Sequence, residues 1–227
     1  VYPQDNSFYC FGCGAGGDAI TFIRKRENLD YPDAVEFLAN RAGITIVNDE
    51  RGSYKTSPKI DRARIFKMNT DAAKYFHQRL FDKTTDAQNA LAYFTQKRGL
   101  SLATIKHFGL GFAPNSYNMF SKHMLSLGYT YDELVAGFLC GKSEERGTYY
   151  DAFRNRVMFP IIDVSGNVIA FGGRVMDDSK PKYINTSDTL VYKKSNGVFA
   201  LNFAKNANEN KLILVEGYMD VIALHQA

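Results

Sequence analysis

A polar stretch from Asn48 to Lys59 separates this sequence into two parts. The stretch contains Gly52, Ser53 and Pro58 and almost no side chain that could be buried. Such a composition is typical of a linker between folded parts. We therefore expect separate folded parts on either side of a linker at residues 48–60.

A Cys-x2-Cys pair, Cys10 and Cys13, follows a short predicted strand at Ser7–Tyr9. Zinc prefers four soft or borderline ligands in a tetrahedron, and a tight turn with this spacing supplies two of them. A redox-active pair and two incidental core thiols are the alternatives, although a redox pair normally opens a helix directly after a strand. The chain's four histidines stand far apart and show no ligand-like spacing. The pair predicts half of a zinc site.

Helix signals occur in both parts. Asp18 is a candidate N-cap, and a helix beginning near Pro32 should end at Gly43, before a short strand at Ile44–Val47. A long helix is expected from Asp61 to Phe81 because its apolar residues recur along one stripe. The stripe consists of Ile65, Met68, Ala72, Phe76 and Leu80. Further helices are predicted at Asp86–Arg98, after Ser101, and after the capping-box spacing of Thr130 and Glu133.

Strand signals follow Gly147. The apolar runs Val157–Ile162 and Val168–Phe171 flank a turn at Gly166 and predict a hairpin. Lys211–Val215 is a continuous apolar run, typical of a strand buried on both faces, and Asp220–Gln226 should begin a helix. The order predicts an α+β fold with helices and a mixed sheet, which leads into the first β–α unit of an α/β, parallel-sheet domain.

Two carboxylates, Glu216 and Asp220, flank the end of that last predicted strand. Open α/β sheets bind ligands at the carboxyl ends of their strands, and two carboxylates one turn apart can hold Mg²⁺ through water. An ordinary N-cap aspartate with an unrelated glutamate is the alternative, and the spacing alone leaves it open.

Basic residues concentrate after Gly147. Arg154 and Arg156 alternate at the entrance of a predicted strand and can point the same way, and Arg174 ends the next strand. Lys182, Tyr183 and Asn185 bring together a cation, an aromatic ring and an amide, a combination that suits phosphates and stacked bases. Lys193 and Lys194 follow. A solvated charged face is the alternative, since five Asp residues dilute the patch and the net charge is only +4.

Cysteine usage and hydropathy restrict the setting. Three cysteines form no disulfide framework, so a reducing, cytoplasmic setting is expected. No apolar run approaches the ~20 residues of a membrane span, so no membrane partner is expected.

Several of these segments, in this order, resemble bacterial DnaG-type DNA primases. The matching segments are 11–18 around Cys13, 93–100 ending in Arg98-Gly99-Leu100, 110–114, 153–161, 166–174, 181–186, and 216–221 beginning with Glu216-Gly217. Any one of these motifs is weak evidence, but so many in sequence are specific.

The resemblance implies four parts along the chain. Residues 1–47 would be the C-terminal part of a zinc-binding domain, 48–60 a linker, 61–210 the N-terminal subdomain of an RNA polymerase core, and 211–227 the start of a Toprim domain. Because the chain begins with Val1 and stops soon after Asp220, we expect a fragment of a longer enzyme that is inactive alone.

The function implied is DNA priming by a nucleotidyltransferase in a bacterial cytoplasm. A DNA-directed RNA polymerase would make short RNA primers from ribonucleoside triphosphates on single-stranded DNA, and a C-terminal region not included here would contact the replicative helicase. Glu216 and Asp220 would hold Mg²⁺ or Mn²⁺, and Cys10 and Cys13 would hold Zn²⁺. The remaining implied site residues bind nucleic acid or nucleotide: Arg98, Arg154, Asn155, Arg156, Arg174, Lys182, Tyr183, Asn185 and Lys193.

The chain departs from the family pattern at Ala152, where an Arg is usual, and it lacks the Asp-x-Asp motif of Toprim. A non-catalytic module that binds single-stranded DNA, and another Toprim enzyme such as a nuclease or topoisomerase, are the alternatives. The order of a zinc motif followed by a basic core argues against the latter.

Overall fold

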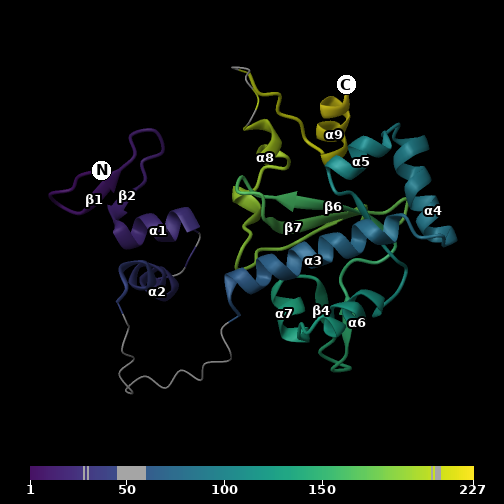
Figure 1. The fold of residues 1–227 in the computed structure, drawn as a ribbon, viewed down its shortest axis with the longest axis horizontal. Helices are drawn as coiled ribbons and strands as arrows, with labels where there is room; N and C mark the ends of the chain where they lie inside the picture. Colours follow the sequence, from purple (N-terminus) through teal and green to yellow (C-terminus); the bar gives the residue numbers. More distant parts are fainter. Residues whose placement is uncertain (28, 30, 45–59, 206, 208–210) are drawn as a thin grey trace. The chain divides into compact units, whose positions relative to one another are not determined.

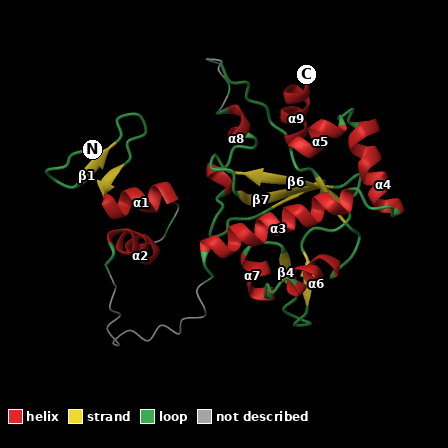
Figure 2. Cartoon of the chain, in the orientation of Figure 1, coloured by secondary structure: helices red, strands yellow, loops and turns green. Residues whose placement is uncertain are grey.

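The computed structural model describes residues 1–227 except 28, 30, 45–59, 206 and 208–210. Contacts divide the chain into two compact units, Val1–Lys59 and Ile60–Ala227. Figures 1 and 2 show the elements of each unit. Most of the predicted strand at Ile44–Val47, and all of the predicted linker except Ile60, lie outside the described residues.

The first unit is a β-hairpin followed by two helices. Strands β1 (Ser7–Tyr9) and β2 (Gly16–Asp18) pair antiparallel, and helices α1 (Ala19–Glu27) and α2 (Tyr31–Ala42) follow. The Asp18 Oδ1 atom accepts the Thr21 N–H at 2.7 Å, which confirms the predicted N-cap. Gly43 has φ +67° at the end of α2, as predicted. A small core of Ile23, Leu29 and Ala34 holds the helices together.

Helix α3 (Arg62–Leu80) is the longest element of the second unit and lies across its sheet (Figure 1). The Asp61 side chain accepts the Ala63 N–H at 3.2 Å and caps the helix. Every residue of the predicted apolar stripe is buried, from Ile65 to Leu80, so that prediction is confirmed. Gly111 permits close packing, because a Cβ atom there would lie 2.6 Å from the Phe76 carbonyl carbon.

The sheet of the second unit has the strand order β3-β6-β7-β8. Its strands are β3 (Gly111–Ala113), β6 (Arg156–Ile162), β7 (Val168–Arg174) and β8 (Tyr183–Asn185). The β6–β7 hairpin turns at Gly166, with φ +93°, as predicted. The expected mixed sheet is wrong for the described strands, since all three pairings are antiparallel. Short returns join β6 to β7 and β7 to β8 and favour antiparallel pairing there, whereas the connection from β3 to β6 contains α6, α7, β4 and β5.

Smaller elements surround the sheet. They are α4 (Thr85–Ala92), a π-helical turn (Tyr93–Lys97), α5 (Leu102–His107), α6 (Met119–Ser126), α7 (Tyr131–Ala136), β4 (Cys140–Lys142), β5 (Tyr149–Asp151), a 3₁₀ turn (Lys194–Asn196), α8 (Leu201–Ala204) and α9 (Tyr218–Gln226). The predicted cap at Ser101 is confirmed, because its hydroxyl accepts the Thr104 N–H at 3.0 Å. The predicted capping box of Thr130 and Glu133 is also confirmed.

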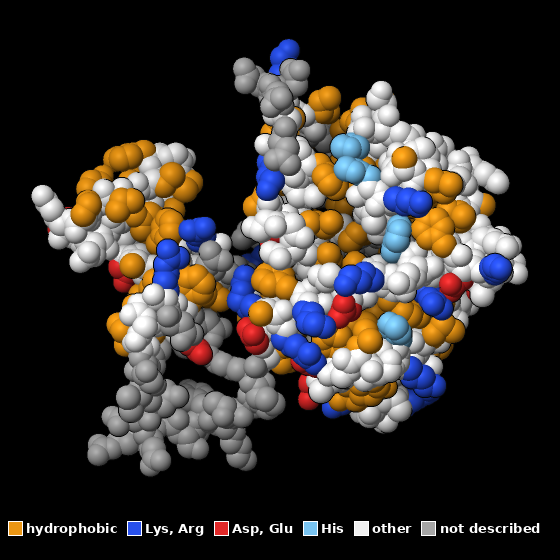
Figure 3. Space-filling view, viewed as in Figure 1, with side chains coloured by type: hydrophobic (Ala, Val, Ile, Leu, Met, Phe, Trp, Pro, Cys, Tyr) orange, Lys and Arg blue, Asp and Glu red, His pale blue; other side chains and the backbone are white. Residues whose placement is uncertain are grey.

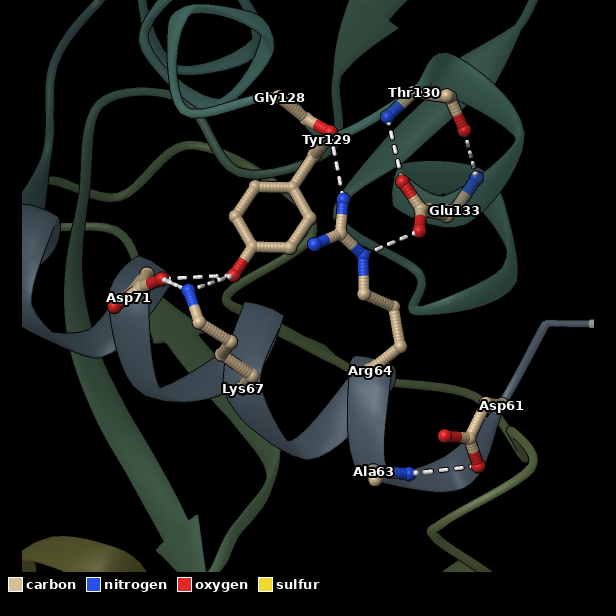
Figure 4. Close-up of polar contacts among 9 residues, drawn as sticks. All are labelled: Asp61, Ala63, Arg64, Lys67, Asp71, Gly128, Tyr129, Thr130 and Glu133. Carbon is tan, nitrogen blue, oxygen red and sulfur yellow. Dashed lines mark hydrogen bonds and ion pairs between the residues drawn. The ribbon is translucent and has the colours of Figure 1, made fainter.

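A polar network fastens the segment before α7 to α3 (Figure 4). The Arg64 Nε–H donates to Glu133 Oε1 at 2.7 Å, and its Nη2 donates to the Gly128 carbonyl at 2.6 Å. The Tyr129 hydroxyl donates to Asp71 Oδ2 at 2.7 Å, and Lys67 Nζ donates to the same oxygen at 3.1 Å. Each charged group in this network has an opposite charge beside it.

The predicted strand at Lys211–Val215 is absent. The run adopts no regular structure, and Leu212, Ile213 and Leu214 are 71%, 78% and 87% exposed. A strand buried on both faces needs hydrogen-bonding neighbours and covering layers, and the described residues place neither beside this run. The helix that follows begins at Tyr218, two residues before the prediction.

Helix α9 nevertheless packs against the rest of the second unit. The Tyr218 ring stacks on Phe159 at 5.3 Å, and its hydroxyl donates to Asn185 Oδ1 at 3.0 Å. At the other end, Gln226 Oε1 accepts the Ser101 N–H at 2.8 Å. No helix in the described part of the chain is long and apolar enough to cross a membrane.

Candidate nucleic-acid interface and metal ligands

The π-helical turn after α4 places a buried tyrosine ring, Tyr93, beside two guanidinium groups. The Cζ atoms of Arg98 and Arg174 lie 5.2 Å and 5.3 Å from the Tyr93 ring centroid. Arg98 Nε–H also donates to the Tyr93 hydroxyl at 2.9 Å, and Arg174 lies 5.6 Å from the Tyr183 ring. π-Helical turns occur frequently at functional sites. The structure thus brings two predicted binding residues, far apart in sequence, onto one ring.

Arg174 retains an unused hydrogen-bond donor. Its Nε atom is buried and has no hydrogen-bond partner among the described residues. A stacked guanidinium keeps its full charge and most of its in-plane N–H groups, and those groups match the oxygens of a phosphate. The geometry around Tyr93 therefore suits an anion.

A second stack was missed by the sequence analysis. The Arg154 Cζ atom lies 4.6 Å from the Tyr117 ring centroid and 5.5 Å from the Tyr150 ring centroid. Tyr117 is 68% exposed and Tyr150 is 37% exposed. Exposed aromatic rings beside a cation are the elements on which nucleic-acid bases stack. The available sequence signal was two tyrosines next to turn residues, which is too common a pattern to single out.

Arg154 and Arg156 do not share a strand face as expected. β6 begins only at Arg156, and Asn155 has φ +48°, so the alternation of a strand does not apply to Arg154. Arg156 is 6% exposed, and its guanidinium donates to the carbonyls of Gly173, Pro181 and Lys182 at 3.4, 2.9 and 3.4 Å. Burial, followed by the charge of Arg154, lowers the pKa of Arg156. These bonds hold the segment before β8 against β7.

The remaining predicted binding residues differ in their surroundings. Lys182 and Lys193 are exposed, whereas Tyr183 and Asn185 are half-buried on β8. Asn185 uses its side-chain oxygen to accept the Tyr218 hydroxyl, so this oxygen anchors α9. Asn155 lines a shallow pocket of about 470 Å³ together with Tyr93, Lys97 and Asp177.

Cys10 and Cys13 are both exposed and form a compact turn after β1. The Cys10 N–H donates to the Ala15 carbonyl at 2.7 Å, and Gly14 N–H donates to the Cys10 carbonyl at 2.8 Å. Hydrogen bonds from Cys13, backbone first, and from the Gly12 backbone lower the pKa of the Cys10 thiol. Zinc binds thiolates, so this environment fits two ligands of a zinc site.

Glu216 and Asp220 lie on either side of Gly217, which is the N-cap residue of α9. Asp220 is therefore not the N-cap, and that alternative is wrong. Both carboxylates are exposed, and Asp220 Oδ2 approaches Gly217 so closely that a Cβ atom there would be 2.9 Å away. Two carboxylates fit a hard divalent cation. In the described residues, however, no three His, Cys, Asp or Glu side chains group as a metal site would need.

Two family models match the chain. The CHC2 zinc finger model matches residues 1–54, and the model of the DNA primase catalytic core, N-terminal domain, matches residues 75–205. A DNA primase of Clostridium acetobutylicum is 44% identical over 226 residues, which are 98% of this chain and 36% of that protein. The chain thus spans about a third of the length of the curated relatives it matches.

Solved structures agree with these matches. The RNA polymerase domain of Mycobacterium tuberculosis primase DnaG is 35% identical, with a TM-score of 0.67 over 73% of this chain and 53% of that one. The DnaG primase catalytic domain bound to single-stranded DNA is 36% identical, with a TM-score of 0.65 over the same shares. On this evidence the chain belongs to the DnaG-type DNA primase family, of which it contains the zinc-finger match and the N-terminal domain of the catalytic core.

Proposed function

We propose that the protein of which this chain is part synthesises short RNA primers on a single-stranded DNA template, and that the described second unit holds the template. The observation that carries the proposal is the set of three arginines stacked on tyrosines, which we call the ring-stacked cations: Arg98 and Arg174 on the buried Tyr93, and Arg154 on the exposed Tyr117. Among the described residues, none of the three forms an ion pair with a carboxylate.

The ring-stacked cations suit a flexible, single-stranded anion. The phosphate backbone supplies most of the affinity for nucleic acid, and aromatic faces accept bases of any sequence. A related catalytic domain has been solved with single-stranded DNA, which supports the same ligand here. The Tyr183 ring lies 5.6 Å from Arg174, and Asn155 lines a pocket with Tyr93. The exposed Lys182 and Lys193 would extend the contact. Arg156, buried under three carbonyls, supports the segment before β8.

Catalysis requires charge stabilisation during nucleotidyl transfer. The 3′-hydroxyl of the growing primer loses its proton and attacks the α-phosphate of an incoming ribonucleoside triphosphate, the bond from the α-phosphorus to the α–β bridging oxygen breaks, and pyrophosphate leaves. Negative charge gathers on the attacking and leaving oxygens. Glu216 and Asp220 would hold Mg²⁺ or Mn²⁺, which supplies the counter-charge when bound. The described residues contribute two ligands, and two carboxylates with substrate phosphates are a usual arrangement for Mg²⁺.

Primer synthesis by the complete protein tests the role of Glu216. Glu216→Gln keeps the shape of the side chain and removes its charge, so the rate should fall by roughly 10²–10³, about 3–4 kcal/mol. Binding of template should change less than about twofold, because the ring-stacked cations are untouched. Glu145→Gln, a matched change at the exposed β4–β5 turn, should leave both unchanged. Full activity of Glu216→Gln would place the metal elsewhere.

Zinc should bind in the first unit of the complete protein. Cys10 and Cys13 would hold it, and the free energy of binding would contribute to folding of that unit. Cys13→Ser should lower the zinc content measured by atomic emission, and a chelator should loosen the first unit and leave the second folded. A zinc content below half an equivalent in the unmodified protein would contradict the assignment.

The remaining parts of the proposal concern the whole protein. The 227-residue chain is expected to be inactive alone, because it spans about a third of the length of its curated relatives and its match to the catalytic core is to the N-terminal domain. A cytoplasmic bacterial setting and contact with a replicative helicase outside residues 1–227 complete the proposed role. A pull-down of the helicase by the complete protein, but not by this chain, is the expected result.

A further inference from the structure

Asp151, the last residue of β5, is a buried carboxylate with no assigned role in the proposal above. It is 2% exposed, and no Lys, Arg or His within the described ranges forms an ion pair with its carboxylate. A buried charge is costly unless hydrogen bonds compensate for the lost water. Its hydrogen bonds therefore identify what it does.

The carboxylate holds the first turn of α6. Asp151 Oδ2 accepts the Phe120 N–H at 2.9 Å, and Oδ1 accepts the Ser121 N–H at 2.9 Å. The N-cap residue of α6, Asn118, makes no side-chain capping bond. Ser116 Oγ accepts the Met119 N–H at 3.1 Å, and Asp151, from thirty positions away, caps the next two N–H groups of the helix. Its charge is favourable at a helix N-terminus.

The backbone of the same residue reaches both members of the second stack. The Asp151 N–H donates to the Tyr117 carbonyl at 2.8 Å, and its carbonyl accepts a hydrogen bond from Arg154 Nη1. Tyr117 lies two residues before α6 begins. One residue therefore fixes the helix that follows Tyr117, the backbone of Tyr117, and the guanidinium stacked on its ring.

We propose that Asp151 is a positioning residue that pre-organises the Tyr117–Arg154 stack for a nucleic-acid base and its phosphate; this inference rests on the proposed function. A tyrosine that is 68% exposed would otherwise sample several orientations. Holding the Tyr117 ring in place before single-stranded DNA binds lowers the conformational entropy that is lost on binding. Asp151 acts through Tyr117 and Arg154 and does not touch the strand.

The carboxylate is required because two N–H groups point at it. An asparagine offers one acceptor oxygen and would turn its NH₂ group toward the other backbone N–H. Asp151→Asn therefore loses one bond at the first turn of α6 and loosens the segment that carries Tyr117. We expect single-stranded DNA to bind about tenfold more weakly to the 227-residue chain by fluorescence anisotropy.

Asp163→Asn is the matched control. Asp163 Oδ1 also accepts two backbone N–H groups, from Ser165 at 2.8 Å and Asn167 at 2.9 Å, at the β6–β7 turn. The substitution removes the same charge, but asparagine keeps the one oxygen that accepts both backbone N–H groups and loses only the bond that Oδ2 accepts from Asn167 Nδ2 at 3.1 Å. It therefore controls for the change of charge, and no stacked ring depends on it. Its affinity should stay within about twofold of the parent.

A double-mutant cycle separates positioning from general damage. In a Tyr117→Ala background, Asp151→Asn should change the affinity by less than about twofold, because the ring it positions is gone. If the two losses multiply instead, Asp151 acts elsewhere and the inference is overturned. If Tyr117→Ala and Arg154→Ala both bind like the parent, the proposed function fails at this stack, which is a different result.

A fluorescence measurement tests positioning without any ligand. The chain contains no Trp, so Tyr117→Trp introduces a single tryptophan reporter. Its steady-state anisotropy should fall when Asp151→Asn is added and stay unchanged when Asp163→Asn is added. Should Asp151→Asn not fold, Asp151→Ser, whose hydroxyl still accepts one N–H, replaces it in both assays. An equally ordered reporter in the Asp151 variant would overturn the proposal.

Discussion

Two sets of cations in the second unit have the same chemistry but differ in whether a carboxylate pairs with them. The ring-stacked cations lie over tyrosines and pair with no carboxylate among the described residues. The paired cations of α3 are Arg64, Lys67 and Lys74; Arg64 and Lys67 also lie over the Tyr129 ring, but all three form ion pairs with Glu133 or Asp71. Figure 3 shows Lys and Arg side chains gathered over α3 with acidic side chains among them. A carboxylate neutralises the positive charge of the side chain it pairs with, whereas an aromatic ring carries no charge and leaves the cation free to bind an anionic ligand. The partner, rather than the residue type, separates binding cations from structural ones.

The largest effect should come from removing the ring-stacked cations together. We expect the Arg98→Ala, Arg154→Ala, Arg174→Ala variant to bind single-stranded DNA on the order of 100-fold more weakly on all sequences, and the salt slope to flatten by roughly two units. The variant Arg64→Ala, Lys67→Ala, Lys74→Ala makes the same charge change and should bind nearly as the parent. Fluorescence anisotropy across a salt series measures both. Equal losses in the two variants would erase the distinction between the sets.

The ring itself should account for part of that effect. Tyr93→Leu removes the face shared by Arg98 and Arg174, so we expect affinity to fall about tenfold. Tyr93→Phe keeps the face and loses only the hydroxyl that accepts from Arg98, so binding should change less than about twofold. If both variants lose the same affinity, the hydroxyl matters and the stacking does not; if neither loses affinity, the ring has no part in binding. Thermal unfolding of each variant controls for lost packing.

The paired cations should instead control stability in acid. The hydrogen bond from Arg64 lowers the pKa of Glu133. Burial pushes the pKa of Asp71 upward, but hydrogen bonds from Tyr129 and Lys67 more than offset it and leave the pKa lowered. Both carboxyls therefore bind protons less readily when folded, so their stabilisation is present above their ordinary pKa values and is lost as pH falls through the lowered ones.

Paired substitution measures that contribution. The double variant Asp71→Asn, Glu133→Gln should cost about 1 kcal/mol of unfolding free energy at pH 7, because the ion pairs are partly exposed. The difference from the parent should shrink as pH falls below the ordinary carboxyl pKa values of about 4, and reach zero below the lowered ones. Urea unfolding at several pH values measures it, and a difference independent of pH would show that these carboxylates are not the titrating groups.

Local patterns in the sequence predicted local structure well. The stripe of α3, the caps at Asp18, Ser101 and Thr130, and the turn at Gly166 all depend on residues within a few positions of each other. Their geometry follows from helix and turn periodicity, which no distant partner needs to complete. The apolar run at Lys211–Val215 failed as a prediction because a strand is made by its neighbours. Periodicity alone does not show whether those neighbours lie beside it.

The candidate site shows the same difference between local patterns and contacts with distant residues. The sequence by itself determined which residue types are present: the Cys-x2-Cys turn, the two carboxylates around Gly217, the arginines of the motifs and the family to which they belong. Only the tertiary structure decided their partners. Folding stacked Arg98 and Arg174 on Tyr93, and it buried Arg156 under three carbonyls. It also placed Arg154 over Tyr117 and brought Asp151 within hydrogen-bonding distance of both residues. The physical reason is that a cation's role depends on the group within about 5 Å of it, and chain folding brings that group from tens of residues away.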